Sequence, residues 1–148
     1  MATRSAIGVL NSVGVIESVY CHWDGYPEHN GVILENFYTD EDKVKALIAE
    51  GDISALGVSI GEKHDFNAKS EYVTSSVGEF ASECTFYGRD RDEKDTESRT
   101  FDSVAEFMHH YGKSGCEFFY MFVGGEWFML DNVYPQGMKS LSNLKVAA

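Results

Sequence analysis

Two apolar runs separated by the pair Gly124-Gly125 constrain the fold of this chain more than any other feature. They extend over Cys116–Leu130, and adjacent glycines suit a two-residue turn of the primed type, so the segment predicts a β-hairpin. Pairing across this turn joins three sets of apolar side chains: Phe122 with Trp127, Tyr120 with Met129, and Met121 with Phe128. Both faces of the hairpin are apolar, so we expect it in the middle of a sheet that is covered on both sides.

The remaining pattern predicts a second hairpin and several helices. Ser5–Leu10 and Val15–Trp23 are expected to pair as strands across the turn residues between them, and Cys84–Arg89 is a further strand candidate. Three segments have helical periodicity, two of them with capping-box spacing: Asn30–Tyr38, the stretch from Thr39 to the stop at Gly51, and Asp102–Tyr111. Residues 52–77 show no clear pattern. We expect a single α+β domain over residues 1–148, with a mostly antiparallel sheet, about three helices and a mobile C-terminal end.

Polar and aromatic residues are densest where the second predicted strand ends, in the run Tyr20-Cys21-His22-Trp23-Asp24-Gly25-Tyr26-Pro27. Side chains alternate along a strand, so His22 and Trp23 face opposite ways. Asp24-Gly25 ends the strand, and Pro27 cannot extend it. Because loops at strand ends often carry function, we expect a ligand site that includes Tyr20, His22, Trp23, Asp24 and Tyr26. The alternative is a run that only anchors a loop to the core, with a structural histidine and a turn-forming aspartate.

Three arginines could complete such a site. Arg4 begins the first hairpin, and antiparallel pairing places it near the Asp24 end of the partner strand. Arg89 and Arg91 directly follow the strand predicted before them. A guanidinium can bind phosphate or carboxylate through two parallel hydrogen bonds. The alternative for each is an ion pair, with Asp90 and Asp92 as the nearest partners of Arg89 and Arg91.

The charge balance limits the classes of partner. The formal net charge is -12, which repels bare nucleic acid and anionic membranes, so we expect neither as a direct partner. A local basic pocket could still bind a phosphate. The acidity could also be the function itself, with carboxylates imitating a DNA backbone, or it could serve solubility alone.

The cysteines and the absence of familiar motifs narrow the chemistry. Cys21, Cys84 and Cys116 are odd in number and lack CxxC spacing, which argues against a disulfide framework or zinc site and favours a reducing cytoplasm. We expect neither a signal peptide nor a membrane-spanning segment. A Gly-rich phosphate loop, HExxH and GxSxG are all missing, so no cofactor or metal is predicted. Enzyme activity would have to come from His22, Asp24, Arg4 and Arg89.

Two segments, Tyr20–Pro27 (YCHWDGYP) and Cys84–Arg91 (CTFYGRDR), resemble a family of small bacteriophage proteins. Thr3-Arg4 and Gly125-Glu126-Trp127 also fit, and the likeness spans most of the chain. Asp92 stands where the family pattern has glycine, which implies a different conformation for that loop. The resemblance carries over no activity. It implies a phage gene product that acts in the bacterial cytoplasm, either against host defences or on host machinery.

Three hypotheses about function follow. The first is a phage accessory protein that sequesters a host component, such as a small nucleotide-like ligand, because aromatic faces stack on bases and arginines take phosphates. The second is an acidic inhibitor or DNA mimic that binds a host defence or nucleic-acid-binding protein through its carboxylates: Asp40, Glu41, Asp42, Asp90, Asp92, Glu93, Asp95 and Glu97. The third is a small hydrolase or nuclease that uses His22. The oligomeric state stays open, a homo-oligomer included.

Overall fold

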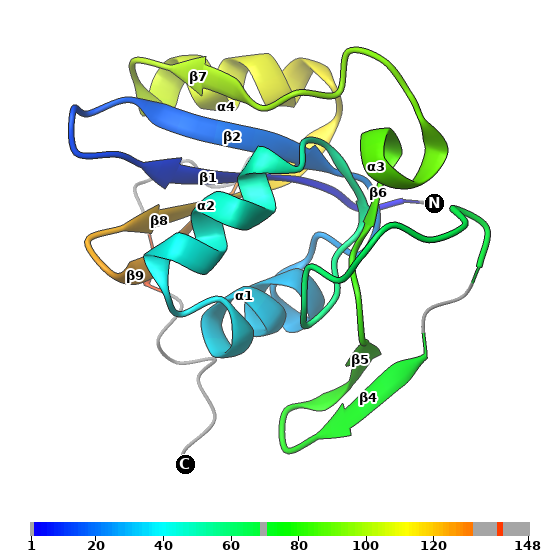
Figure 1. Ribbon diagram of the computed structural model, residues 1–148. Coiled ribbons are helices and arrows are strands. Elements are labelled where there is room, and N and C mark those ends of the chain that lie inside the picture. The colour runs from blue at the N-terminus through cyan, green and yellow to red at the C-terminus, as the bar shows by residue number, and fades with distance from the viewer. Residues whose placement is uncertain (1, 69–70, 132–138, 141–148) are drawn as a thin grey trace.

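The hairpin predicted over Cys116–Leu130 lies inside the main sheet of the computed structural model, which describes residues 2–68, 71–131 and 139–140 (Figure 1). Its strands are β8 (Cys116–Val123) and β9 (Glu126–Asp131), and the three predicted cross-strand pairs are all present. Gly124 and Gly125 both have positive φ, 57° and 86°, as a primed turn requires. The hairpin prediction is therefore confirmed down to its register.

Within the described residues, one sheet of eight strands organises the fold, in the order β10-β9-β8-β1-β2-β3-β6, with β7 also paired to β2. The strands other than β8 and β9 are β1 (Arg4–Leu10), β2 (Ile16–Cys21), β3 (Ile53–Ala55), β6 (Thr85–Phe86), β7 (Arg99–Phe101) and β10 (Lys139–Ser140). A separate two-stranded sheet, β4 (Tyr72–Ser75) and β5 (Gly78–Ala81), projects from the body in Figure 1. Of the eight described strand pairings, only β1–β8 and β2–β3 are parallel.

Helices cover both faces of the main sheet (Figure 1). They are α1 (Val32–Phe37), which follows the π-helical turn η1 (Pro27–Gly31), then α2 (Glu41–Ala49), α3 (Tyr87–Arg91) and α4 (Val104–Lys113). One apolar core joins Tyr120 and Phe122 of β8 to α1 and α2. The other joins Phe119 and Met121 of the same strand to Phe107 of α4. The fold is therefore α+β. Successive side chains of β8 point alternately into the two cores, which explains why this strand is apolar on both sides.

The three predicted helices are present, with small shifts at their ends. Asp40, rather than Thr39, caps α2, since its carboxylate accepts a hydrogen bond from the N–H of Asp42 at 3.4 Å. Ser103 caps α4 and accepts from the N–H of Glu106 at 3.1 Å. The segment 52–77, which shows no sequence pattern, contains β3 and β4. The C-terminal end, for which the sequence predicts mobility, lies outside the described residues.

The strand predicted over Cys84–Arg89 is wrong for most of its length. Only Thr85–Phe86 pairs as a strand, and Tyr87–Arg91 forms the short helix α3. The Asp90 carboxylate accepts from the Phe86 N–H at 2.8 Å, which ties the helix to the residue that precedes it. The helix ends at Asp92 with φ 57°, a left-handed conformation that glycine and a few short polar residues adopt readily. Arg89 and Arg91 therefore lie on a helix rather than after a strand.

Candidate functional site

The run Tyr20–Pro27 leaves the sheet as its sequence predicts. β2 ends at Cys21, although the N–H groups of His22 and Trp23 still donate to the carbonyls of Ile53 and Ser54 at 3.0 and 3.1 Å. The chain then turns against β1, where the Gly25 N–H donates to Thr3 O at 2.8 Å. A Cβ on Gly25 would lie 2.7 Å from the Cβ of Ser5, so the turn accepts only glycine at this position.

Tyr20, His22 and Trp23 contact one another in a row. The Tyr20 hydroxyl and His22 Nδ1 are 2.8 Å apart. Burial raises the pKa of Tyr20 to about 12, against the effect of Arg4, so the hydroxyl keeps its proton and donates. Burial, and then Arg4, lower the pKa of His22, so a neutral imidazole accepts this bond through Nδ1. The His22 and Trp23 rings meet edge to face with centroids 4.8 Å apart.

Arg4 lies beside this row, as antiparallel pairing predicts. Burial has the larger effect on both groups, but the positive charge of the Arg4 guanidinium acts to lower the pKa of Tyr20 and of His22. The Arg4 guanidinium therefore lies close to both side chains. Arg4 also pairs with Cys116 of β8. Its Nη1 atom lies 3.1 Å from where a Cβ on Gly115 would stand. The structure therefore brings together Arg4, Tyr20, His22 and Trp23.

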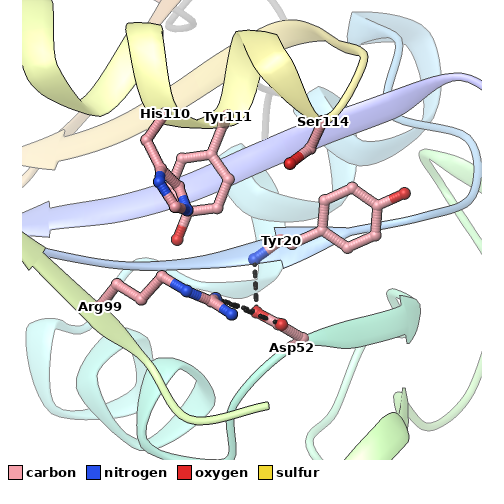
Figure 2. A pocket seen from close by; sticks show the side chains of 6 residues that line it. All are labelled: Tyr20, Asp52, Arg99, His110, Tyr111 and Ser114. Atoms are coloured by element: carbon pink, nitrogen blue, oxygen red, sulfur yellow. Dashed lines mark hydrogen bonds and ion pairs between the residues drawn. The ribbon is translucent and has the colours of Figure 1, made fainter. Parts of the chain in front are cut away.

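A cavity of about 230 Å³ opens beside Tyr20, between β2, β7 and α4. Six residues line it: Tyr20, Asp52, Arg99, His110, Tyr111 and Ser114. Figure 2 shows His110 and Tyr111 reaching from α4 on one side, with Arg99 and Asp52 on the other. We call this cavity the Arg99 pocket. Of its lining, the sequence predicts only Tyr20 as a site residue.

Asp52 and Arg99 form the polar centre of the Arg99 pocket. Nη1 of Arg99 lies 3.2 and 3.3 Å from the two carboxylate oxygens of Asp52, and the Tyr20 N–H donates to Asp52 Oδ1 at 3.0 Å (Figure 2). Burial raises the pKa of Asp52, and these two donors only partly oppose it. Burial works against the charge of Arg99, but Asp52 and Tyr111 raise its pKa on balance, so the guanidinium is firmly cationic. The contacts with Arg99 and the Tyr20 N–H therefore do not fully offset the cost of burying the Asp52 charge.

Positive charge gathers around this pocket although the chain is acidic overall. The pKa of His110 is lowered by burial and then by Arg99 and Lys113, so both cations lie near its ring. Arg4 adds a third cation beside Tyr20. The chain has only 12 Lys and Arg residues against 24 Asp and Glu residues, so one arginine in the lining, with two further cations near the lining residues Tyr20 and His110, departs from the overall balance. Such a pocket can hold a small anion.

Asp24 and Tyr26 contact each other rather than the Arg99 pocket. The Tyr26 hydroxyl donates to Asp24 Oδ1 at 3.4 Å, and Asp24 is the largest cause of the raised pKa of Tyr26. Tyr26 is exposed, and neither residue lines the pocket. Asp24 has φ 55°, in keeping with the turn-forming alternative.

Arg89 is fully engaged within the fold. Its Nε donates to Asp90 Oδ1 at 3.0 Å, and its two terminal nitrogens donate to the carbonyls of Ile60, Gly61 and Cys84 at 2.9–3.0 Å. The predicted alternative of an ion pair with Asp90 is therefore present. Four of the five N–H donors of this guanidinium are therefore used within the fold, which leaves no pair of donors for two parallel hydrogen bonds to a ligand.

Arg91 is exposed and contacts other residues than the remaining predicted site residues do. Its guanidinium lies 5.0 Å from the ring centroid of Phe66, and its Nε is 3.8 Å from Glu93. It pairs with Glu93 rather than with Asp92, and it does not line the Arg99 pocket. The structure therefore does not join Arg89 and Arg91 to Arg4.

The cysteines do not supply a nucleophile. Cys21, Cys84 and Cys116 are all buried free thiols. Burial raises the pKa of Cys21 and of Cys116 to about 12, so both are protonated at neutral pH and react slowly. Across the described residues, no three His, Cys, Asp or Glu side chains gather closely enough to hold a metal ion. None of the helices in that part of the chain is both long and apolar enough to cross a membrane.

We expect the protein to lose stability as the pH falls below about 6.5, because the pKa values of His22 and His110 are both lowered in the folded state. Below about pH 6.5 these two histidines bind protons more readily in the unfolded chain than in the folded one. Their contribution to stability is therefore complete above about pH 6.5 and is lost as the pH falls through their lowered folded-state pKa values. Urea unfolding at about pH 7.5 and 5.5 measures the loss, and replacing both histidines with glutamine should reduce it. An equal loss in the double variant would contradict this assignment.

Comparison of the chain with protein-family models, with curated proteins and with solved structures gives no match.

Proposed function

We propose that this protein is a phage accessory protein that sequesters a small anionic ligand of its host, such as a nucleotide signal, in the Arg99 pocket. The observation that supports this most directly is the Arg99 guanidinium in the pocket lining, with Lys113 near His110 and Arg4 near Tyr20, in a chain of net charge -12. The phage origin and the host setting rest on the resemblance of Tyr20–Pro27 and Cys84–Arg91 to phage proteins.

The size of the Arg99 pocket suits one part of a nucleotide rather than the whole of it. Its volume of about 230 Å³ lies below the roughly 300–1,000 Å³ of pockets that enclose drug-sized ligands. The phosphoryl group is the part that matches the lining, because Arg99 is cationic and has five N–H donors, of which some already contact Asp52 and the Asp95 carbonyl. Ser114 is exposed beside it and supplies a hydroxyl. A base or sugar would then extend past Tyr20 towards solvent.

Binding without turnover is the simpler reading of this geometry. His22 does not line the Arg99 pocket, and its Nδ1 is occupied by the Tyr20 hydroxyl. A hydrolase that used His22 as its base would need a substrate on the far side of Tyr20. Arg99, in contrast, is held by Asp52 before any ligand arrives, which lowers the entropic cost of binding.

Thermal unfolding against a panel of linear and cyclic nucleotides tests the proposal. A ligand at a hundred times its Kd adds about 2.7 kcal/mol to the stability of the folded state, which is readily seen. Arg99→Ala should weaken the binding of a stabilising nucleotide at least tenfold, or about 1.4 kcal/mol. Arg91→Ala is the matched control, since it removes the same charge from an exposed position outside the pocket.

Four results distinguish sequestration in the pocket from its alternatives. Recovery of the intact nucleotide after incubation supports sequestration, whereas its conversion supports an enzyme. Equal weakening by Arg91→Ala and Arg99→Ala would show a diffuse charge effect and would contradict the pocket. A full panel without any thermal shift would also contradict it.

An acidic inhibitor of a host protein is the second candidate, because seven of the eight carboxylates that suggest it are exposed. Asp90 is the exception, since it is buried and pairs with Arg89. A pull-down from host lysate at low salt tests this candidate. Recovery of a nucleic-acid-binding protein would support it, and recovery of none would count against it.

A further inference from the structure

A second cavity, of about 470 Å³, lies beside Trp23, and among the described residues it shares no lining residue with the Arg99 pocket. Three aromatic side chains, Trp23, Phe66 and Tyr72, border it together with Ser54, Thr85 and Glu83. We call it the Trp23 groove. We propose that the Trp23 groove is a docking site for a basic segment of a partner protein, with a guanidinium or ammonium group over the Trp23 ring.

The aromatic surface of the groove is exposed and held in place. Trp23 is 45% exposed and Tyr72 is 65% exposed, which is unusual for side chains of this size. The Trp23 ring rests edge to face on His22, and its backbone N–H is bonded to Ser54 O. A fixed indole face is the best aromatic partner for a cation.

One ring of the groove already binds a cation on the protein itself. The Arg91 guanidinium lies 5.0 Å from the Phe66 ring centroid, within the range of a cation–π contact. Phe66 is braced from another side by Tyr87, with ring centroids 5.6 Å apart. The contact between Arg91 and Phe66 therefore shows that an aromatic ring of this groove can hold a guanidinium.

The charge around the groove favours a cation over an anion. Between Ser54 and Thr85 the sequence has two lysines, Lys63 and Lys69, against five carboxylates: Glu62, Asp65, Glu71, Glu79 and Glu83. Arg91, which lies against Phe66, adds one further cation, so carboxylates still outnumber cations. The Glu83 carboxylate lines the groove and is held there by the Glu62 N–H at 3.1 Å. A phosphate would face this carboxylate, whereas a basic side chain would be attracted to it. The net charge of -12 adds a long-range attraction for a basic partner.

The size of the groove indicates a segment rather than a single cationic group. A volume of about 470 Å³ falls within the range of pockets that take drug-sized ligands. A guanidinium fills only part of it, so the neighbouring residues of a partner chain would occupy the rest. This inference is independent of the proposed function, since the ligand has the opposite charge and the two cavities have separate linings.

Calorimetric titration with an amidated penta-arginine peptide tests the inference, with penta-glutamate as the control probe. We expect the basic peptide to bind and the acidic one not to bind. Trp23→Leu and Tyr72→Ser should each weaken the basic peptide at least tenfold, while Val13→Ser leaves it unchanged, because Val13 is 80% exposed on the turn between β1 and β2. None of these three substitutions changes the charge of the protein, so a loss confined to the first two cannot come from long-range attraction.

Intrinsic fluorescence adds a second readout. The chain has two tryptophans, and Trp127 is only 2% exposed, so a spectral change on adding the peptide reports on Trp23. Equal affinities in the wild type and all three variants would overturn the proposal in favour of diffuse charge attraction. Binding of adenosine with the same Trp23 dependence, but not of the peptide, would overturn it in favour of base stacking. Arg99→Ala should leave peptide binding intact, which separates a failure here from a failure of the Arg99 pocket.

Discussion

Replacing Arg89 with alanine should destabilise the fold by about 3–5 kcal/mol, the range found when one partner of a buried ion pair is removed. The side chain is only 13% exposed and its guanidinium lies 4.6 Å from the Phe86 ring centroid. Its removal leaves the Asp90 carboxylate without its charged partner and takes the donor from the carbonyls of Ile60, Gly61 and Cys84. Buried acceptors that lose their donors carry the full cost of desolvation.

Urea denaturation of Arg89→Ala and Arg91→Ala provides the measurement. Arg91 is 58% exposed, so its replacement should change the free energy of unfolding by about 0.5 kcal/mol or less. Arg89→Lys should fall between the wild type and the alanine variant, because an ammonium keeps the charge but cannot reach several acceptors at once. Weaker ligand binding by Arg89→Ala at an unchanged urea midpoint would show instead that this arginine belongs to a binding site.

The parts of the fold that follow from local rules are visible in the sequence. The two-residue turn at Gly124-Gly125 sets the register of the central hairpin, and every predicted pair across it is present. The first hairpin places Arg4 near the end of β2 for the same reason, since antiparallel pairing fixes which ends of two strands meet. The proximity of Arg4 to Tyr20 and His22 therefore follows from local pairing. The contact between the His22 and Trp23 rings does not, because strand alternation predicts that these two side chains face opposite ways.

The Arg99 pocket could not be predicted, because its residues come from distant segments. Asp52 directly precedes β3, Arg99 begins β7 and His110 belongs to α4. They meet because β3 and β7 both pair with β2, one parallel and one antiparallel, and single-sequence periodicity contains no information on such pairing. The burial of the Asp52 carboxylate could have indicated the site, but burial is a property of the fold and is not visible in the sequence.

The role of Arg89 was hidden for a related reason. The alternation in Cys84–Phe86 continues into Tyr87 and imitates a strand, so the sequence placed Arg89 at a strand end. Its acceptors at Ile60 and Gly61 lie in a segment without periodicity, and the local contact with Asp90 could equally be a surface ion pair. Only the long-range packing distinguishes a structural arginine from a binding one.

Asp52→Asn should tighten binding of an anionic ligand in the Arg99 pocket about tenfold, because it removes a negative charge that lies within a few ångströms of the bound anion. The stability should change by only about 1 kcal/mol or less, since asparagine keeps an oxygen for the Tyr20 N–H and for Arg99. The raised pKa of Asp52 supports this, because a folded-state pKa above the unfolded value means that ionisation of Asp52 lowers stability at neutral pH. Asparagine imitates the protonated form and removes that cost.

Asp90→Asn is the matched control, since both aspartates are buried, at 9% and 8% exposure, and both contact an arginine. Burial raises the pKa of Asp90, but hydrogen bonds from Arg89 and from the N–H groups of Phe86 and His64 lower it on balance. Its ionised form therefore contributes stability above about pH 3.8, and Asp90→Asn should cost roughly 1.5–3 kcal/mol at neutral pH without changing ligand affinity. Urea unfolding and nucleotide titration of the two variants decide the matter. Equal destabilisation by both would mean that Asp52 is a structural anchor like Asp90, whereas a gain of affinity confined to Asp52→Asn would identify the uncompensated carboxylate with the binding site.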